Sequence, residues 1–143
     1  MLPLNFIAIL VAAVVSFIIG AIWHTVLFSK LWLQLAGIPE PTEAEKQEYA
    51  KHMWKPLLSG FTLNLVMAFC LANIIHVTAV YFNAVGSISN GLGVAFWTWL
   101  GFVATVTMSP VIWERRSIKY WAFGAAYNLT IMLVMGAIIG WWV

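Results

Sequence analysis

The chain has 143 residues, of which 63% are hydrophobic and 8% are charged, and its formal net charge is +2. A typical soluble domain is about 45–50% apolar and about 25% charged. This composition therefore excludes water-soluble enzymes, nucleic-acid-binding modules and disordered chains. The length suits one domain, residues 1–143. We predict an all-α, polytopic membrane protein.

Four long apolar stretches each approach the roughly 20 residues that a helix needs to cross a bilayer. None of them contains Asp, Glu, Lys or Arg. The first stretch lacks a basic leading segment and a small-residue cleavage site, so it is a span rather than a signal peptide. The sequence therefore predicts a four-helix transmembrane bundle. Its expected spans are residues 4–28, 56–81, 91–112 and 120–142.

Every charged side chain falls in one of two connections, which join the first span to the second and the third to the fourth. By the positive-inside rule this side is cytoplasmic, so we expect both termini outside a bacterial inner membrane. Three basic residues, Arg115, Arg116 and Lys119, sit together at the second connection. They suit an anionic lipid headgroup, and the alternative is that they only set the topology.

The nine tryptophans lie near the ends of the expected spans. This distribution is typical of two interfacial aromatic belts, and an aromatic cage for a ligand is the alternative. Within the longer connection, Thr42 and Glu45 form a capping-box pattern, and Glu48 can pair with Lys51 and His52. We predict an amphipathic helix over 43–54 on the membrane surface, with a solvated connector as the alternative.

Two parallel helical hairpins are suggested by a weak internal repeat. Gly60 and Asn64 in the second span match Gly124 and Asn128 in the fourth, at an offset of 64 residues. If the repeat holds, the bundle has a pseudo-twofold axis along the membrane normal.

Small residues at four-residue spacing allow transmembrane helices to approach closely. Three spans carry such a pattern, and we expect these positions to pack inside the bundle rather than form a dimer interface. The patterns are Ala8, Ala12, Ser16 and Gly20 in the first span, Gly93, Gly101, Thr105 and Ser109 in the third, and Gly136 and Gly140 in the fourth.

Because no span contains a charge, the candidate functional groups are neutral polar side chains. The predicted topology places one set of them in the cytoplasmic half of the bundle, where lipid cannot satisfy their hydrogen bonds. They suggest a polar pocket that opens to the cytoplasm, and interhelical hydrogen bonding without a pocket is the alternative. The candidate pocket residues are His24, Asn64, Asn128, Thr105, Ser109 and Tyr127.

Catalytic patterns are missing from the sequence. It has no paired carboxylates in a span, no HExxH zinc motif and no phosphate-binding Gly-Lys-Ser/Thr loop. Its one cysteine, Cys70, excludes an internal disulfide, and His76 has no second ligand at its depth for a metal. We expect no enzyme activity, no cofactor and no metal.

Several segments resemble a family of small four-helix bacterial membrane proteins of unknown function. In the first half these are Gly20-Ala-Ile-Trp-His24 and Phe28-Ser-Lys-Leu-Trp32. In the second half they are Trp99-Leu-Gly-Phe-Val103, Glu114-Arg-Arg116 and Tyr127-Asn128. The resemblance covers almost the whole chain and implies a membrane location and a fold, but no reaction.

Two functions remain open on the sequence. The first is binding or transport of a small solute through the neutral polar pocket. The alternative is a non-catalytic accessory subunit that binds lipid or a larger membrane protein through the surface helix. The expected partners are the lipid bilayer and either a second copy of the chain or a larger membrane protein, and not nucleic acid.

Overall fold

The computed structural model describes residues 4–142, and every regular element in this range is helical. The predicted domain, residues 1–143, extends beyond this range at 1–3 and 143. Two of the elements, η1 and η2, are π-helical. The elements are α1 (Phe6–Ile22), η1 (Trp23–Leu27), α2 (Ser29–Ala36), α3 (Glu43–His52), α4 (Trp54–Tyr81), α5 (Ile88–Thr98), η2 (Trp99–Ala104), α6 (Thr105–Thr107), α7 (Ser109–Trp113) and α8 (Ile118–Trp142).

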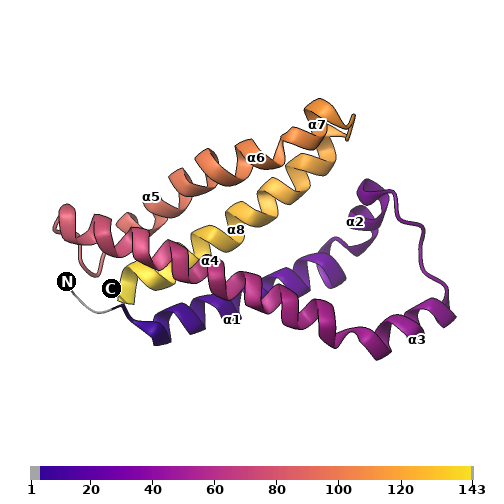
Figure 1. Ribbon diagram of the computed structural model, residues 1–143, viewed down its shortest axis with the longest axis horizontal. Coiled ribbons are helices and arrows are strands. Elements are labelled where there is room, and N and C mark those ends of the chain that lie inside the picture. Colours follow the sequence, from indigo (N-terminus) through magenta and orange to yellow (C-terminus); the bar gives the residue numbers. More distant parts are fainter. Residues whose placement is uncertain (1–3, 143) are drawn as a thin grey trace.

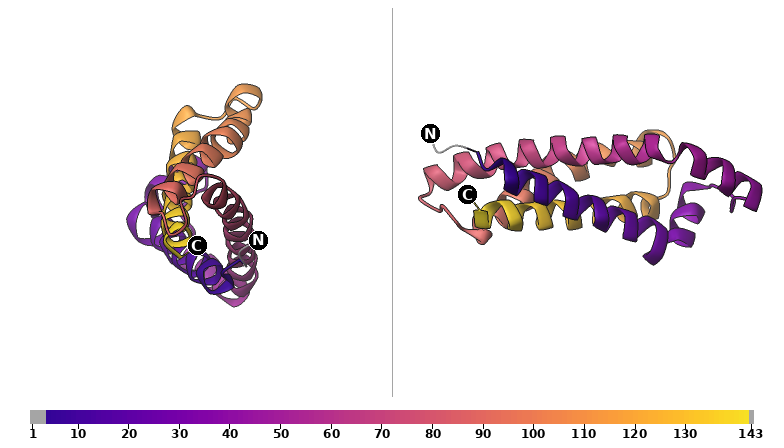
Figure 2. Two further views of the ribbon diagram at one scale, coloured as in Figure 1. Left: turned by 90° about the vertical axis from the view of Figure 1, so that its left-hand side faces the viewer. Right: turned by 90° about the horizontal axis from the view of Figure 1, so that it is seen from below.

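Four helices are long and apolar enough to cross a membrane, which confirms the predicted four-helix architecture. Their bounds differ from the predicted spans by a few residues at most. The observed spans are Phe6–Leu27, Trp54–Tyr81, Ile88–Trp113 and Ile118–Trp142. Figure 2 shows that they run along the long axis of an elongated bundle.

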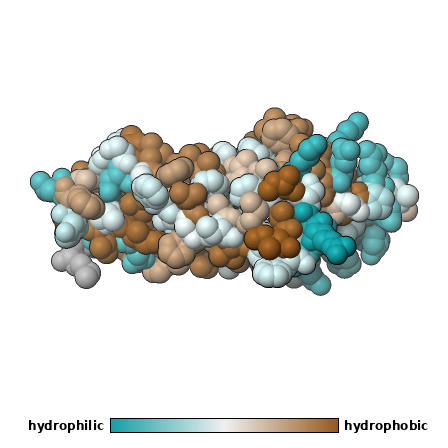
Figure 3. All heavy atoms as spheres, turned by 90° about the horizontal axis from the view of Figure 1, so that it is seen from above, coloured by the Kyte–Doolittle hydropathy of each residue, from teal (hydrophilic) through white to brown (hydrophobic). Residues whose placement is uncertain are grey.

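The two ends of the bundle differ in character. The connections that carry the charged residues lie together at one end, here named the charged end (Figure 1). At the other end, the terminal end, the Asn5 side-chain amide donates to the Trp142 carbonyl oxygen over 3.5 Å. Figure 3 shows hydrophilic residues concentrated at the charged end and hydrophobic residues along the middle of the molecule.

The small-residue stripe of the first span packs inside the bundle, as predicted. Ala8, Ala12, Ser16 and Gly20 are all buried. The Ser16 hydroxyl donates to the Ile131 carbonyl of α8 over 3.4 Å, so α1 and α8 are joined by a hydrogen bond as well as by packing.

Glycines bring α5 and α8 into backbone contact near the terminal end. Gly91 of α5 lies against Gly136 and Gly140 of α8, and a methyl group on Gly91 would overlap the Gly136 carbonyl. The Gly136/Gly140 pair therefore packs within the chain, as the sequence predicted.

The small-residue stripe predicted for the third span is wrong. Gly93, Gly101, Thr105 and Ser109 are exposed, and nothing lies within 4 Å of a methyl group built on Gly93 or Gly101. The contact face instead carries Gly91, two residues earlier than Gly93. The four-residue count also fails beyond Trp99, because a π-helix makes i→i+5 hydrogen bonds and shifts the following residues around the axis.

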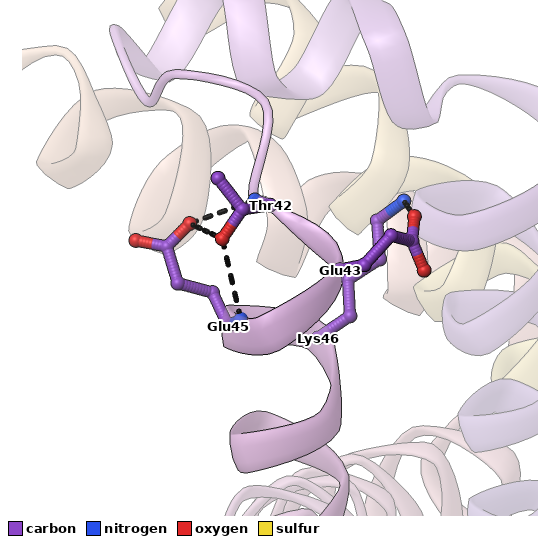
Figure 4. Close-up of polar contacts among 4 residues, drawn as sticks. All are labelled: Thr42, Glu43, Glu45 and Lys46. Atoms are coloured by element: carbon purple, nitrogen blue, oxygen red, sulfur yellow. Dashed lines mark hydrogen bonds and ion pairs between the residues drawn. The ribbon is translucent and has the colours of Figure 1, made fainter.

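The predicted capping box begins α3 (Figure 4). The Thr42 backbone N–H and hydroxyl donate to a Glu45 carboxylate oxygen over 2.7 and 2.8 Å, and the Glu45 N–H donates to the Thr42 hydroxyl oxygen over 3.3 Å. The backbone bond and then the hydroxyl bond lower the pKa of Glu45. Beside the box, Lys46 forms an ion pair with Glu43 at 2.7 Å (Figure 4), which raises the pKa of Lys46.

Further along α3, Glu48 pairs with Lys51 at 3.2 Å and lies 3.6 Å from the His52 ring, both as predicted. Every residue of α3 is exposed. The helix ends at His52, and α4 begins at Trp54, two residues before the predicted start of the second span at Pro56.

A short helix that the sequence analysis did not predict, α2, follows the first span. Gly37 ends it in the left-handed region at φ 70°, where glycine has no side chain to clash. The Ile38 N–H donates to the Leu33 carbonyl and the Gly37 N–H to the Gln34 carbonyl, which together form a Schellman motif.

Candidate functional site: an aromatic cleft at the charged end

A cleft of about 240 Å³ lies toward the charged end. Residues of η1, α2, α6 and α8 form its walls, and no residue of α4 is among them. The lining residues are His24, Trp32, Leu35, Thr107, Tyr120, Trp121, Phe123, Gly124, Ala125 and Asn128.

The cleft lies where the third and fourth spans diverge from the second span. At the terminal end α5 and α8 touch through glycines, whereas toward the charged end α7 and the start of α8 lean away from α4 (Figures 1 and 2). The first span ends in η1, where the Phe28 N–H donates to the Trp23 carbonyl, five residues back. The helix breaks at Phe28, and α2 then carries Trp32 and Leu35 to the cleft beside α8.

Three polar side chains of the cleft use their hydrogens on backbone carbonyls of their own helices. His24 Nδ1 lies 2.9 Å from the Gly20 oxygen, and Asn128 Nδ2 lies 2.9 Å from the Gly124 oxygen. The Thr107 hydroxyl donates to the Val103 oxygen over 2.7 Å. Because a carbonyl only accepts, these bonds place the proton of the neutral imidazole on Nδ1 and fix the orientation of the Asn128 amide.

An acceptor atom remains unused on both His24 and Asn128. In neutral His24, Nε2 carries a lone pair, and Oδ1 of Asn128 accepts in the same way. Neither atom has a hydrogen-bond partner among residues 4–142. The cleft therefore offers unused acceptors on two of its walls, one from the first span and one from the fourth.

Two tryptophans tie the third and fourth spans together beside the cleft. The Trp121 indole N–H donates to the Ala104 carbonyl over 3.1 Å, and the Trp99 indole N–H donates to the Ala125 carbonyl over 2.9 Å. Ala104 is the last residue of η2, so the π-helical segment supplies one of these acceptors. The Trp121 ring lines the cleft with its own donor already used.

An aromatic cluster supports the wall formed by η1 and α8. The His24 ring meets the Tyr127 ring edge-on, with 4.7 Å between centroids, and meets the Phe123 ring at 5.9 Å. Trp23 packs against Phe28 at 4.9 Å and against Tyr127 at 6.0 Å. Such contacts between rings hold their positions beyond what area burial alone provides.

The structure brings some of the predicted pocket residues together and separates others. His24 and Asn128 line the cleft, and Tyr127 supports it through the His24 ring. Asn64 is buried in α4, where Nδ2 donates to the Gly60 carbonyl over 2.9 Å and Oδ1 has no partner. Thr105 and Ser109 are exposed outside the cleft. Asn64 and Asn128 therefore share the same bond to their own helix but not the same cavity.

The basic residues of the second charged connection are exposed near the mouth of the cleft. Arg115 has a positive φ of 56° in the turn before α8. The Arg116 guanidinium lies 5.6 Å from the centre of the Tyr120 ring, which is itself a lining residue. Lys119 is on the first turn of α8 and is also exposed.

The sequence analysis selected pocket residues by their polar groups and therefore did not assign most of the aromatic residues to the site. Trp32, Tyr120, Trp121 and Phe123 form much of the wall, and the sequence analysis assigned the two tryptophans to a belt. The tryptophans in fact divide into two groups. Four are half-buried, namely Trp23, Trp32, Trp99 and Trp121, and five are exposed, namely Trp54, Trp97, Trp113, Trp141 and Trp142. The usable signal was Gly37, which marks the end of α2, the short helix that carries Trp32 to the cleft.

Metal-binding side chains do not gather in the described residues. No group of three or more His, Cys, Asp or Glu in residues 4–142 is placed to hold an ion. His76 is buried in α4, and its Nε2 has no hydrogen-bond partner in this range.

Together, the all-helical fold and its four apolar spans define a polytopic membrane protein with an aromatic cleft at one end. The family model described as "Protein of unknown function (DUF1761)" matches residues 7–140, so the chain belongs to this family. This match confirms the family resemblance of the sequence motifs. No curated protein and no solved structure matches the chain.

Proposed function

We propose that the protein binds a small solute in the cleft at the charged end, as a binding or transport protein of the membrane. One observation carries the proposal. His24 and Asn128, from the first and fourth spans, meet in a cavity of about 240 Å³ with unused acceptor atoms. Side chains that served only to join helices would spend these atoms on one another, since lipid cannot satisfy them.

We propose further that the charged end is cytoplasmic and the membrane is a bacterial inner membrane. The support is that all seven Lys and Arg residues lie at that end, either in the two connections or, for Lys55 and Lys119, on the first turn of the helix that follows. The cleft then opens toward the cytoplasm, and the termini are outside. With Cys70 changed to Ser, a single cysteine at Arg116 is expected to resist a membrane-impermeant maleimide in intact cells, whereas one at Ala84 should react.

The chemistry of the lining supports binding rather than catalysis. The ten lining residues include no carboxylate, thiol or amine, and the imidazole of His24 has no acidic partner among them. General acid–base and nucleophilic catalysis both need such a partner to tune or activate the reacting group. The cleft is therefore suited to holding a molecule unchanged.

Filling the cleft tests the binding function. Gly124 lines the cavity, and nothing lies within 4 Å of a methyl group placed on it, so Gly124→Leu puts a side chain into the cleft without a clash. Gly101→Leu is the matched control, because Gly101 is exposed and equally unobstructed. Ligand-observed NMR with a fragment library and detergent-solubilised protein should identify binders that Gly124→Leu loses and Gly101→Leu keeps. Equal loss in both variants would contradict the proposal.

A role as an accessory subunit is the second candidate, and α3 is the observation that favours it. Every residue of α3 is exposed, and the helix projects beyond the bundle (Figure 1). A partner or a lipid surface would then contact Tyr49 and Met53 on this segment. Gentle solubilisation followed by size-exclusion chromatography and mass spectrometry would support this role if a larger membrane protein co-purifies. Finding the chain always alone would count against it.

A further inference from the structure

The unused hydrogen-bonding atoms of the cleft indicate the chemical class of its ligand, and this step rests on the proposed binding function. The hydrogens of His24 Nδ1 and Thr107 Oγ1 point to backbone carbonyls, and Asn128 Nδ2 directs one of its two hydrogens to the Gly124 carbonyl. The Trp121 indole N–H is used in the same way, on Ala104. Nε2 of His24 and Oδ1 of Asn128 therefore remain as unused acceptors at the cleft, and a bound molecule matches them by supplying a hydrogen.

Hydrogens remain available on three lining groups, which are the second amide hydrogen of Asn128, the Trp32 indole N–H and the Tyr120 hydroxyl. Neither the Trp32 indole N–H nor the Tyr120 hydroxyl has a hydrogen-bond partner among residues 4–142. The hydroxyl also accepts, so a ligand that donates a hydrogen can still be matched at Tyr120. Nε2 of His24 and Oδ1 of Asn128 accept only, so they are matched only by a ligand that carries a hydroxyl or N–H.

The charges around the cleft do not favour a cation. No lining residue is a carboxylate, so a bound cation would have no counter-ion. At the mouth, the Arg116 guanidinium already occupies a place near the face of Tyr120 at 5.6 Å and would repel a second positive charge. Placing an unpaired charge in such a site is costly, whereas an uncharged donor has its partners in place.

Shape and size favour a flat ring system. The walls contain four aromatic side chains, Trp32, Tyr120, Trp121 and Phe123, whose flat faces suit stacked or edge-on contacts with another ring. The cavity of about 240 Å³ exceeds the roughly 150 Å³ of a cavity that binds benzene. One or two fused rings are therefore accommodated, but not a large amphiphile.

We propose that the ligand of this cleft is an uncharged aromatic molecule of one or two rings that carries a hydroxyl or N–H group. The ring lies among the tryptophan and phenylalanine side chains. Its hydroxyl or N–H donates to Nε2 of His24 or Oδ1 of Asn128. Simple phenols, naphthols and indoles have this chemistry.

Two probe molecules measure how much a hydrogen-bond donor on the ligand contributes to binding. 2-Naphthol and 2-fluoronaphthalene have the same ring and nearly the same size, but only the naphthol donates a hydrogen bond. We expect isothermal titration of the detergent-solubilised protein to show at least roughly tenfold tighter binding of 2-naphthol, the effect of one well-made hydrogen bond. Uptake of both probes by the micelle is subtracted with Gly124→Leu, in which the cleft is filled.

Variants of Asn128 and His24 test whether these two acceptors cause the preference for 2-naphthol over 2-fluoronaphthalene. Asn128→Leu should remove most of the preference for 2-naphthol while retaining the binding of both rings. Asn73→Leu is the matched control, because Asn73 makes the same bond to its own helix, 2.8 Å to the Phe69 carbonyl, but is exposed outside the cleft. His24→Phe keeps an aromatic ring beside Tyr127 and removes Nε2, so it repeats the test if Asn128→Leu does not fold.

The outcomes separate this inference from the function on which it rests. If both probes bind the cleft with equal affinity, or if a trimethylammonium derivative of naphthalene binds more tightly than 2-naphthol, the proposed ligand class is overturned and the binding function stands. If Gly124→Leu binds both probes as well as the unmodified protein does, the cleft is not the site, and both proposals fail for these ligands. A preference that Asn128→Leu or His24→Phe removes and Asn73→Leu keeps supports the inference.

Discussion

The two ends of this bundle are built from opposite kinds of residue. At the terminal end Gly91, Gly136 and Gly140 let two helix backbones touch. At the charged end the corresponding space between helices is occupied by large rings, among them Trp32, Trp121 and Phe123, which leave a cleft between them. Small residues give a tight contact that tolerates no added atom. Rings joined by a few hydrogen bonds hold helices apart at a set distance. The terminal end is therefore held by backbone contact, and the charged end contains the cleft.

The largest expected change in stability comes from a substitution at the terminal end. Gly91→Ala places a methyl group on the Gly136 carbonyl, so we expect a loss of about 1–3 kcal/mol in the free energy of unfolding. Gly93→Ala, two residues along the same helix, meets nothing and should gain up to about 1 kcal/mol from helix propensity. Thermal unfolding in detergent, followed by circular dichroism, compares the two. Equal stability of the two variants would contradict the claim that the glycine contact holds α5 and α8 together at the terminal end.

At the charged end, stability depends on single hydrogen bonds. Trp121→Phe retains a ring but removes the indole N–H that reaches Ala104, so we expect a loss of roughly 0.6–2 kcal/mol in unfolding free energy. Trp113→Phe is the control, because the Trp113 side chain is exposed and should change stability little. Chemical unfolding in mixed micelles gives both values. A larger loss for Trp113→Phe would mean that the lipid-facing ring, and not the bond between helices, stabilises this end.

Asn64 provides a third test, because its buried amide lies in neither the glycine contact of the terminal end nor the cleft of the charged end. Among residues 4–142 its Oδ1 has no partner, and its only hydrogen bond there is to its own helix. Asn64→Leu removes the unsatisfied oxygen, so we expect unfolding free energy to stay equal or rise by about 1 kcal/mol. Ligand binding in the cleft should be unchanged. A clear loss of stability would show that Asn64 joins helices.

The smallest expected effect concerns pH and α3, outside both regions. Hydrogen bonds from Thr42 lower the pKa of Glu45 in the folded state from its ordinary value of 4.5. A carboxyl with a lowered pKa stabilises the fold above its unfolded pKa, and this contribution is lost as the pH falls through the folded value. The first turn of α3 should therefore be constant above about pH 5 and fray in more acidic solution. Carbon chemical shifts of residues 42–46 measure this, and Glu45→Gln should abolish the pH dependence.

Sequence reasoning predicted the features that depend on local chemistry. Apolar runs of sufficient length gave the four spans, and the pattern from Thr42 to Glu45 predicted the start of α3. The stripe that includes Ala12 and Ser16 was assigned to the correct face, because it lies in a regular helix before any π-turn.

The contact face of the third span and the cleft could not be predicted by counting residues along a regular α-helix. In the third span both faces are apolar, so the residues alone do not distinguish Gly91 from Gly93 as the contact position. The π-turn at η2 shifts the later residues of the third span around the helix axis, which displaced Thr105 and Ser109 from the predicted pocket. The cleft itself arises because the helix breaks at Phe28 and α2 returns to the bundle, a tertiary event that a local pattern does not predict, and Gly37 marks only the end of α2.

The cleft is the central claim, and a density map tests it most directly. We suggest single-particle imaging of the protein in lipid nanodiscs, bound to an antibody fragment for size, at a resolution that shows ordered small molecules. The account predicts an open cavity or non-protein density between His24, Asn128 and Phe123, with the His24 and Asn128 side chains still bonded to Gly20 and Gly124. Side chains that close the space, with Nε2 of His24 bonded directly to the Asn128 amide, would contradict it.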